Sequence, residues 1–531
     1  MVAEHEGGYT PFHVDISNYL VPGRPATLIV RACDHNDAAT PVGKQTRRWY
    51  THSSGIWQPV HLEGRPAVHV ATARITTPLT PVPHASLAID VDTGALPSGD
   101  LVTVEVSSPD RLFPSVLTTV TARADGTHAH ATVSVTPDRP RLWSPDDPFL
   151  YHATITCRTT RVSASGDAAS SAATDSAPRD TVHTYFGIRE VRTAKMDGRP
   201  LEVIHLNGKP IYLRGALDQA FHPDGVHAYP TDEVIRADIQ AAKDLGLNML
   251  RCHIKINDPR YYYWADVLGV TIFYDLPCTI VDGPTARRHW EATFRDAVAR
   301  DANHPSIIAW ILFNETWGLE RHDEENGWQW VESMFHLCKA LDPTRIVEDN
   351  SPCLYDHVTS DINTWHFYIT SWGSARTHVQ RVVDQTYSGS DFNYVGGKFG
   401  DTARRFVQGT APLLNSEYAG LSARQGEKDI AHTFRYLTTV LRAHEAITGY
   451  VYTELTDIEW EHNGLVNYDR TAKVFGYDAA FPGMEPADVN GADFIGFDAP
   501  PFEWVAPDTT ITLSTFVSHW ADASIEGATL H

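Results

Sequence analysis

Two glutamates occupy positions in the sequence from which they could do acid–base or nucleophilic chemistry. Glu315 follows the apolar run 307–313, and Glu417 follows the apolar residues 413–414. A carboxylate at the end of a buried strand is partly removed from water, which can raise its pKa. Two such carboxylates about 5 Å apart can cleave a glycosidic bond with retention, one as nucleophile and the other as acid and base. Either glutamate alone could instead be a surface ion pair or a helix N-terminal carboxylate.

Further polar residues stand at the ends of other apolar runs, where they could meet a substrate. Arg251 could hold a neighbouring carboxylate ionised through charge-assisted hydrogen bonds. His366 and Tyr368 could contact sugar hydroxyls, and a structural role stays open for each histidine. The remaining candidates for substrate binding at such ends are Asn314, His253 and Tyr452. The histidines show no metal-ligand spacing, so no metal and no cofactor is predicted.

The elements that must position these side chains alternate between strands and helices after residue 200. Continuous apolar runs are typical of strands that are buried on both faces. Helical patterns separate them, the first with Thr231 as N-cap and Gly246 after its last turn. Eight such units predict a (β/α)₈ barrel, whose catalytic groups lie at the carboxyl ends of the strands. A doubly wound open sheet is the alternative. The predicted strands are 211–215, 248–253, 270–276, 307–313, 346–350, 363–368, 413–417 and 449–454.

The rest of the chain has strand-like sequence. Residues 66–190 contain short β-branched runs between Pro, Gly and Asp turns, which is typical of a β-sandwich. A low-complexity stretch at 163–180 is predicted to be a hairpin loop within it. Strands are also expected near 10–16 and 26–32. We therefore divide the chain into a partial β-domain (1–65), a sandwich (66–190), the barrel (191–490) and the start of a C-terminal β-domain (491–531).

Composition excludes several classes of protein. The formal net charge of −23 would repel a nucleic acid backbone. No apolar run approaches the roughly 18–20 residues of a membrane helix. The six cysteines form no Cys-x-x-Cys pair, which argues against a zinc site or a disulfide framework. No signal peptide is visible, so a cytoplasmic location is expected, although the start of the chain looks incomplete.

At several of these residues the sequence resembles glycoside hydrolase family 2, the family of β-galactosidases, β-glucuronidases and β-mannosidases. The stretch 303–315, Asn-His-Pro-Ser-Ile-Ile-Ala-Trp-Ile-Leu-Phe-Asn-Glu, is similar to its acid/base signature, and Ser-Glu-Tyr at 416–418 to its nucleophile strand. Residues 6–12 and 54–57 resemble its jelly-roll domain, residues 142–151 and 185–189 its immunoglobulin-like sandwich, and residues 206–215 the start of its barrel.

The resemblance implies roles for individual residues. Glu315 would be the acid/base, Glu417 the nucleophile, Asn314 a partner of the sugar 2-hydroxyl, and Arg251 a neighbour of the nucleophile. The run after Gly215, Ala-Leu-Asp-Gln-Ala-Phe-His, departs from the family's Asn-Arg-His-Glu, and we take its Asp218 as a candidate substrate-binding residue.

Other departures from the family bear on the sugar. Strand two ends Arg-Cys-His-Ile-Lys-Ile where the family commonly has Arg-x-Ser-His-Tyr-Pro, and the Asn-x-Lys pair that binds a glucuronate is not evident after strand eight. A neutral terminal sugar, as in a β-galactosidase, is therefore expected. A furanosidase (β-galactofuranosidase or α-L-arabinofuranosidase) is the alternative within the family. A catalytically decayed carbohydrate-binding protein is the alternative from another class. The expected partner is a carbohydrate, homo-oligomerisation stays open, and both ends of the chain look truncated.

Overall fold

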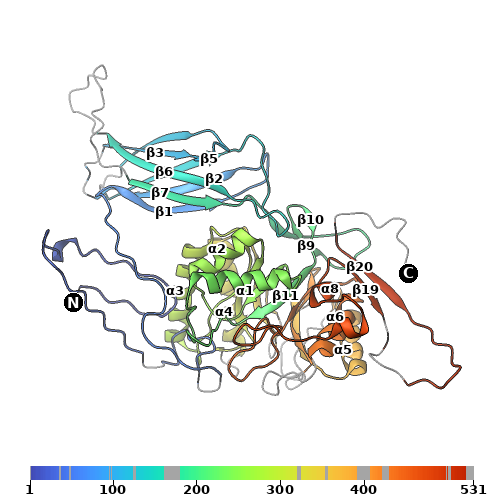
Figure 1. Ribbon diagram of the computed structural model, residues 1–531. Helices are drawn as coiled ribbons and strands as arrows, with labels where there is room; N and C mark the ends of the chain where they lie inside the picture. Colours follow the sequence, from blue (N-terminus) through green and yellow to red (C-terminus); the bar gives the residue numbers. More distant parts are fainter. Residues whose placement is uncertain are drawn as a thin grey trace.

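The computed structural model describes residues 2–521 except 35–36, 47–48, 95, 97–98, 123–126, 161–179, 320–323, 353–356, 391–406, 421–429, 498 and 500–503. Figure 1 shows a β-sandwich (β1–β7) above a helix-covered barrel. The N-terminal segment runs beside the barrel on the left, and a hairpin (β19–β20) lies on the right. None of the helices in the part of the chain described is long and apolar enough to cross a membrane.

The N-terminal segment is extended rather than paired into a sheet. Within its described residues up to 67 there is one short 3₁₀ helix, Ser17–Tyr19, and no strand. The strands expected near 10–16 and 26–32 are therefore not formed, because a strand needs a neighbour for its backbone hydrogen bonds. Residues closer to the barrel are anchored: the backbone N–H groups of Val42 and Gly43 donate to the carbonyl of Cys278 at 2.9 and 3.1 Å.

The sandwich consists of two antiparallel sheets. One has the order β1-β2-β5 and the other β4-β3-β6-β7. Burial alternates along the strands, so every second side chain enters a shared core of mainly valine, isoleucine and alanine. The expected loop at 163–180 lies almost entirely outside the described residues. The strands are β1 (His69–Thr76), β2 (Ala85–Asp92), β3 (Leu101–Ser107), β4 (Val116–Thr121), β5 (His128–Val135), β6 (Tyr151–Thr160) and β7 (Asp180–Phe186).

A small sheet links the sandwich to the barrel. It has the order β10-β9-β8 and contains β8 (Val191–Ala194), β9 (Val203–Leu206) and β10 (Lys209–Pro210). Side chains from β8 and β9 pack into the same apolar cluster as the inward residues of the barrel. This sheet therefore closes the end of the barrel at which the strands begin.

The barrel is an eight-stranded sheet with the order β15-β14-β13-β12-β11-β18-β17-β16. Every hydrogen-bonded strand pair in it is parallel. This confirms the predicted fold class. The strands are β11 (Leu213–Asp218), β12 (Met249–Cys252), β13 (Thr271–Asp275), β14 (Ile307–Asn314), β15 (Ile346–Ser351), β16 (Asn363–Tyr368), β17 (Leu413–Ala419) and β18 (Ile447–Tyr452).

Side chains rather than a strand ladder join β15 to β16. The Thr364 hydroxyl donates to Glu348 at 2.6 Å, and Ser351 Oγ lies 2.8 Å from His366 Nε2. In the described residues the barrel strands are thus joined by backbone ladders everywhere except along this seam.

Helices cover the outside of the barrel (Figure 1). The first begins as predicted, with Thr231 Oγ1 accepting from the N–H of Val234 at 3.4 Å. The second ends at Gly269, whose φ of 76° is a left-handed conformation that favours glycine. The helices are α1 (Asp232–Asp244), α2 (Pro259–Leu268), α3 (Pro284–Asp301), α4 (Glu324–Leu341), α5 (Trp372–Gln385), α6 (Ile430–Arg442), α7 (Tyr477–Ala480) and α8 (Pro486–Val489).

Alternation along the barrel strands decides which side chains can reach the site. Leu217, Met249, Phe273 and Val451 belong to the cluster inside the barrel. Their sequence neighbours, such as Tyr274, pack in the layer between strands and helices. Where a strand is regular, successive side chains point to opposite faces, so parity separates Leu217 from its neighbour and Val451 from its neighbour. Register shifts in β17 interrupt this alternation and bring Glu417 into the interior, although it has the parity of the outward Leu413.

The sandwich is fixed to the barrel by buried polar contacts. Arg189 donates to the carbonyls of Pro305, Thr344 and Ile307 at 3.1, 3.1 and 2.8 Å. Trp143 Nε1 donates to the carbonyl of Asp266 at 2.8 Å. These bonds join residues before the barrel to its α2 and β14 units.

The strand-like sequence near the C-terminus forms a hairpin of β19 (Asp493–Phe497) and β20 (Thr515–His519). All five cysteines within the described residues are free.

Candidate active site

Glu315 and Glu417 meet at the carboxyl ends of β14 and β17. One oxygen of each carboxylate and a nitrogen of His366 all lie within 4.8 Å of one another. The Glu417 side chain is 6% exposed and that of Glu315 is 23% exposed. Glu417 therefore lies deeper, and Glu315 lies nearer to solvent.

The backbone at Glu315 adopts a conformation that is rare for residues other than glycine. Glu315 and Thr316 have φ angles of 48° and 63°. Non-glycine residues with positive φ are uncommon and cluster at functional sites. The Glu315 N–H donates to the carbonyl of Ser351 at 2.8 Å, and that of Thr316 to Asn350 Oδ1 at 3.1 Å. Contacts with the end of β15 thus hold this turn.

Arg251 is the centre of the buried hydrogen-bond network. Its Nη1 donates to Glu417 Oε1 at 3.1 Å, and its Nη2 donates to Asn314 Oδ1 at 2.7 Å. Its Nε donates to Asp275, whose Oδ2 lies 2.8 Å away. Charge-assisted hydrogen bonds of this kind favour an ionised carboxylate and fix its orientation. The structure thus brings together Arg251, Asn314 and Glu417.

Tyr368 contacts Glu417, and His366 lies between the two glutamates. The Tyr368 hydroxyl donates to Glu417 Oε2 at 2.7 Å. Burial and the neighbouring charges of Glu417 and Glu315 raise the pKa of Tyr368 well above its usual value, so the hydroxyl keeps its proton. His366 Nδ1 lies 3.0 Å from Glu315 Oε1 and 3.4 Å from Glu417 Oε2.

The electrostatics of Glu315 combine opposing effects. Burial raises its pKa, whereas the hydrogen bond and charge of His366 and the charges of Lys44 and Arg251 lower it. The net result is a pKa below the usual value. His366 therefore sets how readily Glu315 carries a proton.

His253 lies beside this network without contacting either glutamate. Its Nδ1 is 2.9 Å from Asp275 Oδ2. Burial, and then the charges of Lys44, Arg251 and His366, lower the pKa of His253 well below its usual value. The imidazole is therefore neutral at neutral pH.

Two candidate residues lie outside the site. Asp218 accepts hydrogen bonds from Tyr261 of α2 and from the N–H of Ala220, at 2.6 and 2.8 Å. Tyr452 packs edge-on against Tyr418 and against Phe434 of α6. Both have the outward parity, so their side chains lie in the layer between strands and helices rather than with the glutamates.

Several site residues escaped the sequence reasoning. Asp275 stands directly at the end of β13, so the same strand-end argument could have found it. Lys44 comes from the N-terminal segment and is 9% exposed. Its side chain lies over the rings of Trp49 and Tyr50, at 4.7 and 5.5 Å. No local sequence signal connects it with residues far along the chain.

A rim of tryptophans borders the site. The ring centroid of Trp49, in the N-terminal segment, lies 5.2 Å from that of Trp317, two residues after Glu315. It lies 5.3 Å from the ring centroid of Trp460, in the loop after β18. All three are half-buried. The N-terminal segment, β14 and β18 thus share one aromatic surface.

Glu315, His366 and Glu417 are also of the residue types that bind metal ions. Within the described residues theirs is the convergent group of such ligands. The Arg251 guanidinium 3.1 Å from Glu417 Oε1 already supplies a positive charge there. The donor set therefore suits proton transfer better than metal binding.

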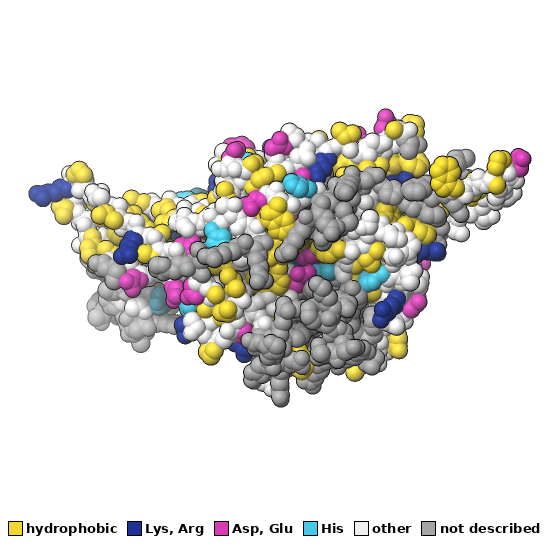
Figure 2. All heavy atoms as spheres, turned by 90° about the horizontal axis from the view of Figure 1, so that it is seen from below, with side chains coloured by type: hydrophobic (Ala, Val, Ile, Leu, Met, Phe, Trp, Pro, Cys, Tyr) yellow, Lys and Arg dark blue, Asp and Glu magenta, His cyan; other side chains and the backbone are white. Residues whose placement is uncertain are grey.

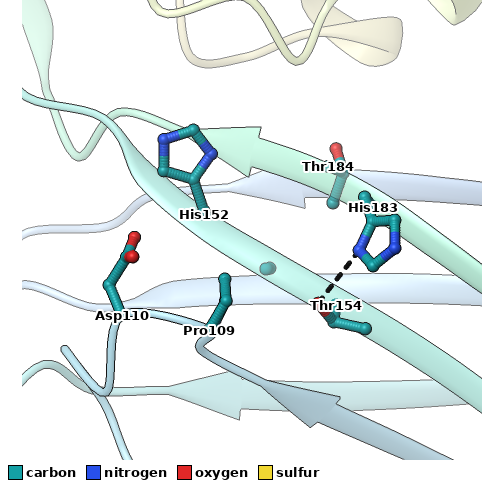
Figure 3. Close-up of a pocket in the computed structure, with 7 residues that line it drawn as sticks. Pro109, Asp110, His152, Thr154, His183 and Thr184 are labelled. Carbon is teal, nitrogen blue, oxygen red and sulfur yellow. Dashed lines mark hydrogen bonds between the residues drawn. The ribbon is translucent and has the colours of Figure 1, made fainter.

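Within the part of the chain that the structure describes, no second group of His, Cys, Asp and Glu side chains converges in this way. Figure 3 shows a shallow pocket on the sandwich, where His183 Nδ1 lies 3.1 Å from the Thr154 hydroxyl and His152 points away from both. On the face seen in Figure 2, acidic and histidine side chains appear near the middle between segments that are not described. Hydrophobic side chains lie along the left arm of that view, where Figure 1 places the N-terminal segment.

Comparison with known proteins assigns two parts of the chain. Residues 200–428 match the family model "Glycosyl hydrolases family 2, TIM barrel domain", and residues 68–165 match "Glycosyl hydrolases family 2". A putative β-glucuronidase of Formosa agariphila is 28% identical over 64% of this chain and 29% of its own length. A β-galactosidase of Pectobacterium atrosepticum is 28% identical over 64% of this chain and 31% of its own length. The chain thus spans about a third of the length of these relatives.

Solved structures share the fold. A family 2 β-galacturonidase of Eisenbergiella tayi superposes with a TM-score of 0.64 at 18% identity, covering 84% of this chain and 76% of the other. A β-glucuronidase of Bacteroides uniformis superposes with a TM-score of 0.61 at 21% identity, covering 84% and 54%.

Proposed function

Because the chain belongs to glycoside hydrolase family 2, we propose that it is a retaining, exo-acting glycosidase that releases a terminal neutral sugar by double displacement. The observation that carries this proposal is the approach of Glu315 and Glu417: one oxygen of each carboxylate lies within 4.8 Å of one oxygen of the other. Retaining glycosidases have carboxyl groups about 5–5.5 Å apart, whereas inverting enzymes have roughly 6.5–9.5 Å to leave room for water.

The two glutamates have different roles in the two steps of the reaction. Glu417 attacks the anomeric carbon while Glu315 gives its proton to the departing glycosidic oxygen, which leaves a glycosyl ester on Glu417. Glu315, now ionised, takes a proton from water as the water oxygen attacks the anomeric carbon and releases Glu417. The more exposed Glu315 suits exchange of protons with solvent, and the deeper Glu417 suits the nucleophile.

The surrounding residues support these roles. Arg251 and Tyr368 donate to the two oxygens of Glu417, at 3.1 and 2.7 Å, and keep the carboxylate oriented. The amide of Asn314, held through its oxygen by Arg251, leaves its NH₂ group to a sugar hydroxyl. Arg251 and Tyr368 are therefore positioning residues for the nucleophile, and Asn314 is a substrate-binding residue.

The proposed class of sugar follows from the sequence that comes after the barrel strands. The relatives are named β-glucuronidase and β-galactosidase. The Asn-x-Lys pair that would bind a glucuronate is absent from the sequence after β18. This favours a neutral sugar, as in a β-galactosidase; a furanosidase is the second candidate. Both glutamates are present, which a decayed carbohydrate-binding protein would not need.

The test replaces the nucleophile. We expect Glu417→Gly to abolish hydrolysis of activated aryl glycosides, because no glycosyl ester can form. Azide should restore turnover by entering the vacated space and giving a glycosyl azide of inverted configuration. Glu417→Gln is the matched control, since its amide removes the nucleophile but fills that space, so azide should not rescue it. Near-normal hydrolysis by Glu417→Gly would show that Glu417 is not the nucleophile.

A further inference from the structure

Four buried polar side chains form a second cluster beside the glutamate pair. Glu454 and Glu461 come from the loop after β18, Gln219 directly follows β11, and Lys44 comes from the N-terminal segment. Gln219 Nε2 donates to Glu461 Oε2 at 3.4 Å, and Lys44 Nζ lies 3.9 Å from Glu461 Oε1. We call these four residues the β18-loop cluster.

The cluster contains acceptors that the protein itself leaves unused. Glu454 and Glu461 are each 1% exposed. Among the described residues, neither oxygen of Glu454 accepts a hydrogen bond within normal limits, and neither does Glu461 Oε1. Gln219 acts on the pKa of Glu454, and Tyr50 interacts with Glu461, but neither contact satisfies these oxygens, and Lys44 is 3.9 Å from Glu461 Oε1. A buried carboxylate without donors is strongly unfavourable, and most buried polar groups in native proteins are satisfied. These oxygens therefore point to donors that a ligand would bring.

The cluster lies beside the glutamate pair. The Thr453 hydroxyl, one residue before Glu454, lies 3.4 Å from the Tyr368 hydroxyl, which donates to Glu417. Lys44 links the two groups electrostatically, because its charge lowers the pKa of both Glu315 and Glu454. Gln219 has the same parity as the inward-facing Leu217.

We propose that Glu454 and Glu461 accept hydrogen bonds from hydroxyl groups of the glycone and so select a neutral sugar against a uronate. This inference rests on the proposed function and names the residues that recognise the sugar to be hydrolysed. Sugar hydroxyls can donate to both carboxyl groups. A uronate carboxylate can only accept, and it would face the negative charge of Glu461. The charge of Lys44, 3.9 Å from Glu461 Oε1, is offset by that of Glu461.

The electrostatics of the cluster agree with a neutral ligand. Burial and the neighbouring charge of Glu461 raise the pKa of Glu454 well above its usual value, more than Lys44 and Gln219 lower it. A protonated Glu454 can both donate to and accept from a hydroxyl. With Lys44 balancing Glu461, the cluster then has no net charge to attract an ionic sugar.

The experiment compares matched substrates. The probes are 4-nitrophenyl β-D-galactopyranoside and the corresponding galacturonide, with other neutral aryl pyranosides and furanosides and a 4-nitrophenyl aminoglycoside. We expect the unaltered protein to favour the best neutral glycoside over the uronide by roughly 100-fold or more in kcat/KM. Glu454→Gln and Glu461→Gln should each lower kcat/KM on the neutral substrate about 10–100-fold. Each should also reduce the ratio of kcat/KM on the neutral substrate to kcat/KM on the uronide.

Glu459→Gln is the control, because Glu459 lies in the same loop but accepts from the exposed N–H of Thr51. Glu459→Gln should change neither kcat/KM on the neutral substrate nor the ratio of that value to kcat/KM on the uronide. Calorimetric binding of galactose and galacturonate to Glu417→Gln gives the same comparison without turnover, and neutral sugar should bind more tightly. Melting temperatures close to that of the unaltered protein show that each variant is folded.

Preference for the uronide or for the aminoglycoside, or unchanged selectivity in both glutamine variants, would overturn the assignment. Azide rescue of Glu417→Gly on whichever substrate is hydrolysed would then still support the retaining mechanism. Loss of the two-glutamate mechanism, by contrast, would appear as full activity of Glu417→Gly. The two failures are therefore distinguishable.

Discussion

At the scale of single residues, the proton carried by Glu315 is the part of the chemistry most open to measurement. We predict that Glu315→Ala slows hydrolysis of a natural disaccharide by roughly 10²–10⁴-fold, since a proton-transfer group is lost. A dinitrophenyl glycoside should lose less in the glycosylation step, because its leaving group departs without a proton. Pre-steady-state rates on both substrates provide the comparison. Equal losses would remove Glu315 from the acid role.

His366 offers a separate test through pH. It lies 3.0 Å from Glu315 Oε1 and, by its hydrogen bond and charge, opposes the effect of burial and lowers the pKa of Glu315. An acid must be protonated to act, so a lowered pKa moves the alkaline limb of the kcat/KM profile to lower pH. In His366→Ala we predict that this limb shifts to higher pH. If His366→Ala lowered kcat/KM equally at every pH and left the alkaline limb in place, His366 would not control the pKa of Glu315.

At the scale of elements, the sequence pattern predicted the barrel and placed Glu315 and Glu417 at strand ends that meet. It did not predict which face of the sheet each strand-end side chain occupies. All eight predicted barrel strands are present, because apolar runs between helical segments leave little ambiguity. Asp218 was assigned to the site from the departure of its segment from the family motif, and Tyr452 from its position at a strand end, yet both side chains point outward. The inward neighbours Leu217 and Val451 carry no polar group to mark that face. Lys44 was unpredictable because only the folded N-terminal segment brings it to the barrel.

The loops after β11 and β12 are joined by another buried lysine. Lys255 Nζ donates to the carbonyls of Ala220 and His227 at 2.5 and 2.6 Å, and burial lowers its pKa to about 7. Below about pH 7 both the folded and the unfolded chain hold this proton. Between about pH 7 and 10 the unfolded chain binds more protons, so the contribution of Lys255 to stability increases with pH.

We therefore predict that the difference in unfolding free energy between the unaltered protein and Lys255→Met grows in favour of lysine above pH 7. The slope should reach up to about 1.4 kcal/mol per pH unit and vanish below pH 6. Urea titrations at several pH values measure it. The two carbonyls left without a donor in the methionine variant add an offset that does not vary with pH. A pH-independent difference would mean that the lysine titrates normally.

At the scale of the whole molecule, the sandwich and the barrel are expected to unfold together. Arg189 is 5% exposed and donates to three barrel carbonyls. We predict that Arg189→Ala lowers the unfolding free energy by about 3 kcal/mol or more, because these buried acceptors lose a charged donor. Arg141→Ala is the control, since its ion pair with Asp147 is about half exposed and should be worth about 1 kcal/mol or less. Equal effects of the two variants in urea titrations would show that the contact is not a joint between domains.

The seam between β15 and β16 also divides the barrel between its two glutamates. Glu315 belongs to the part that runs from β11 to β15, and Glu417 to the part that runs from β16 to β18. A chain cut in the connection after β15 would break no strand ladder, and the pieces would still share the β11–β18 pairing. Under the proposed mechanism neither piece would carry both glutamates. Colour released from an aryl glycoside would then report the meeting of the two halves.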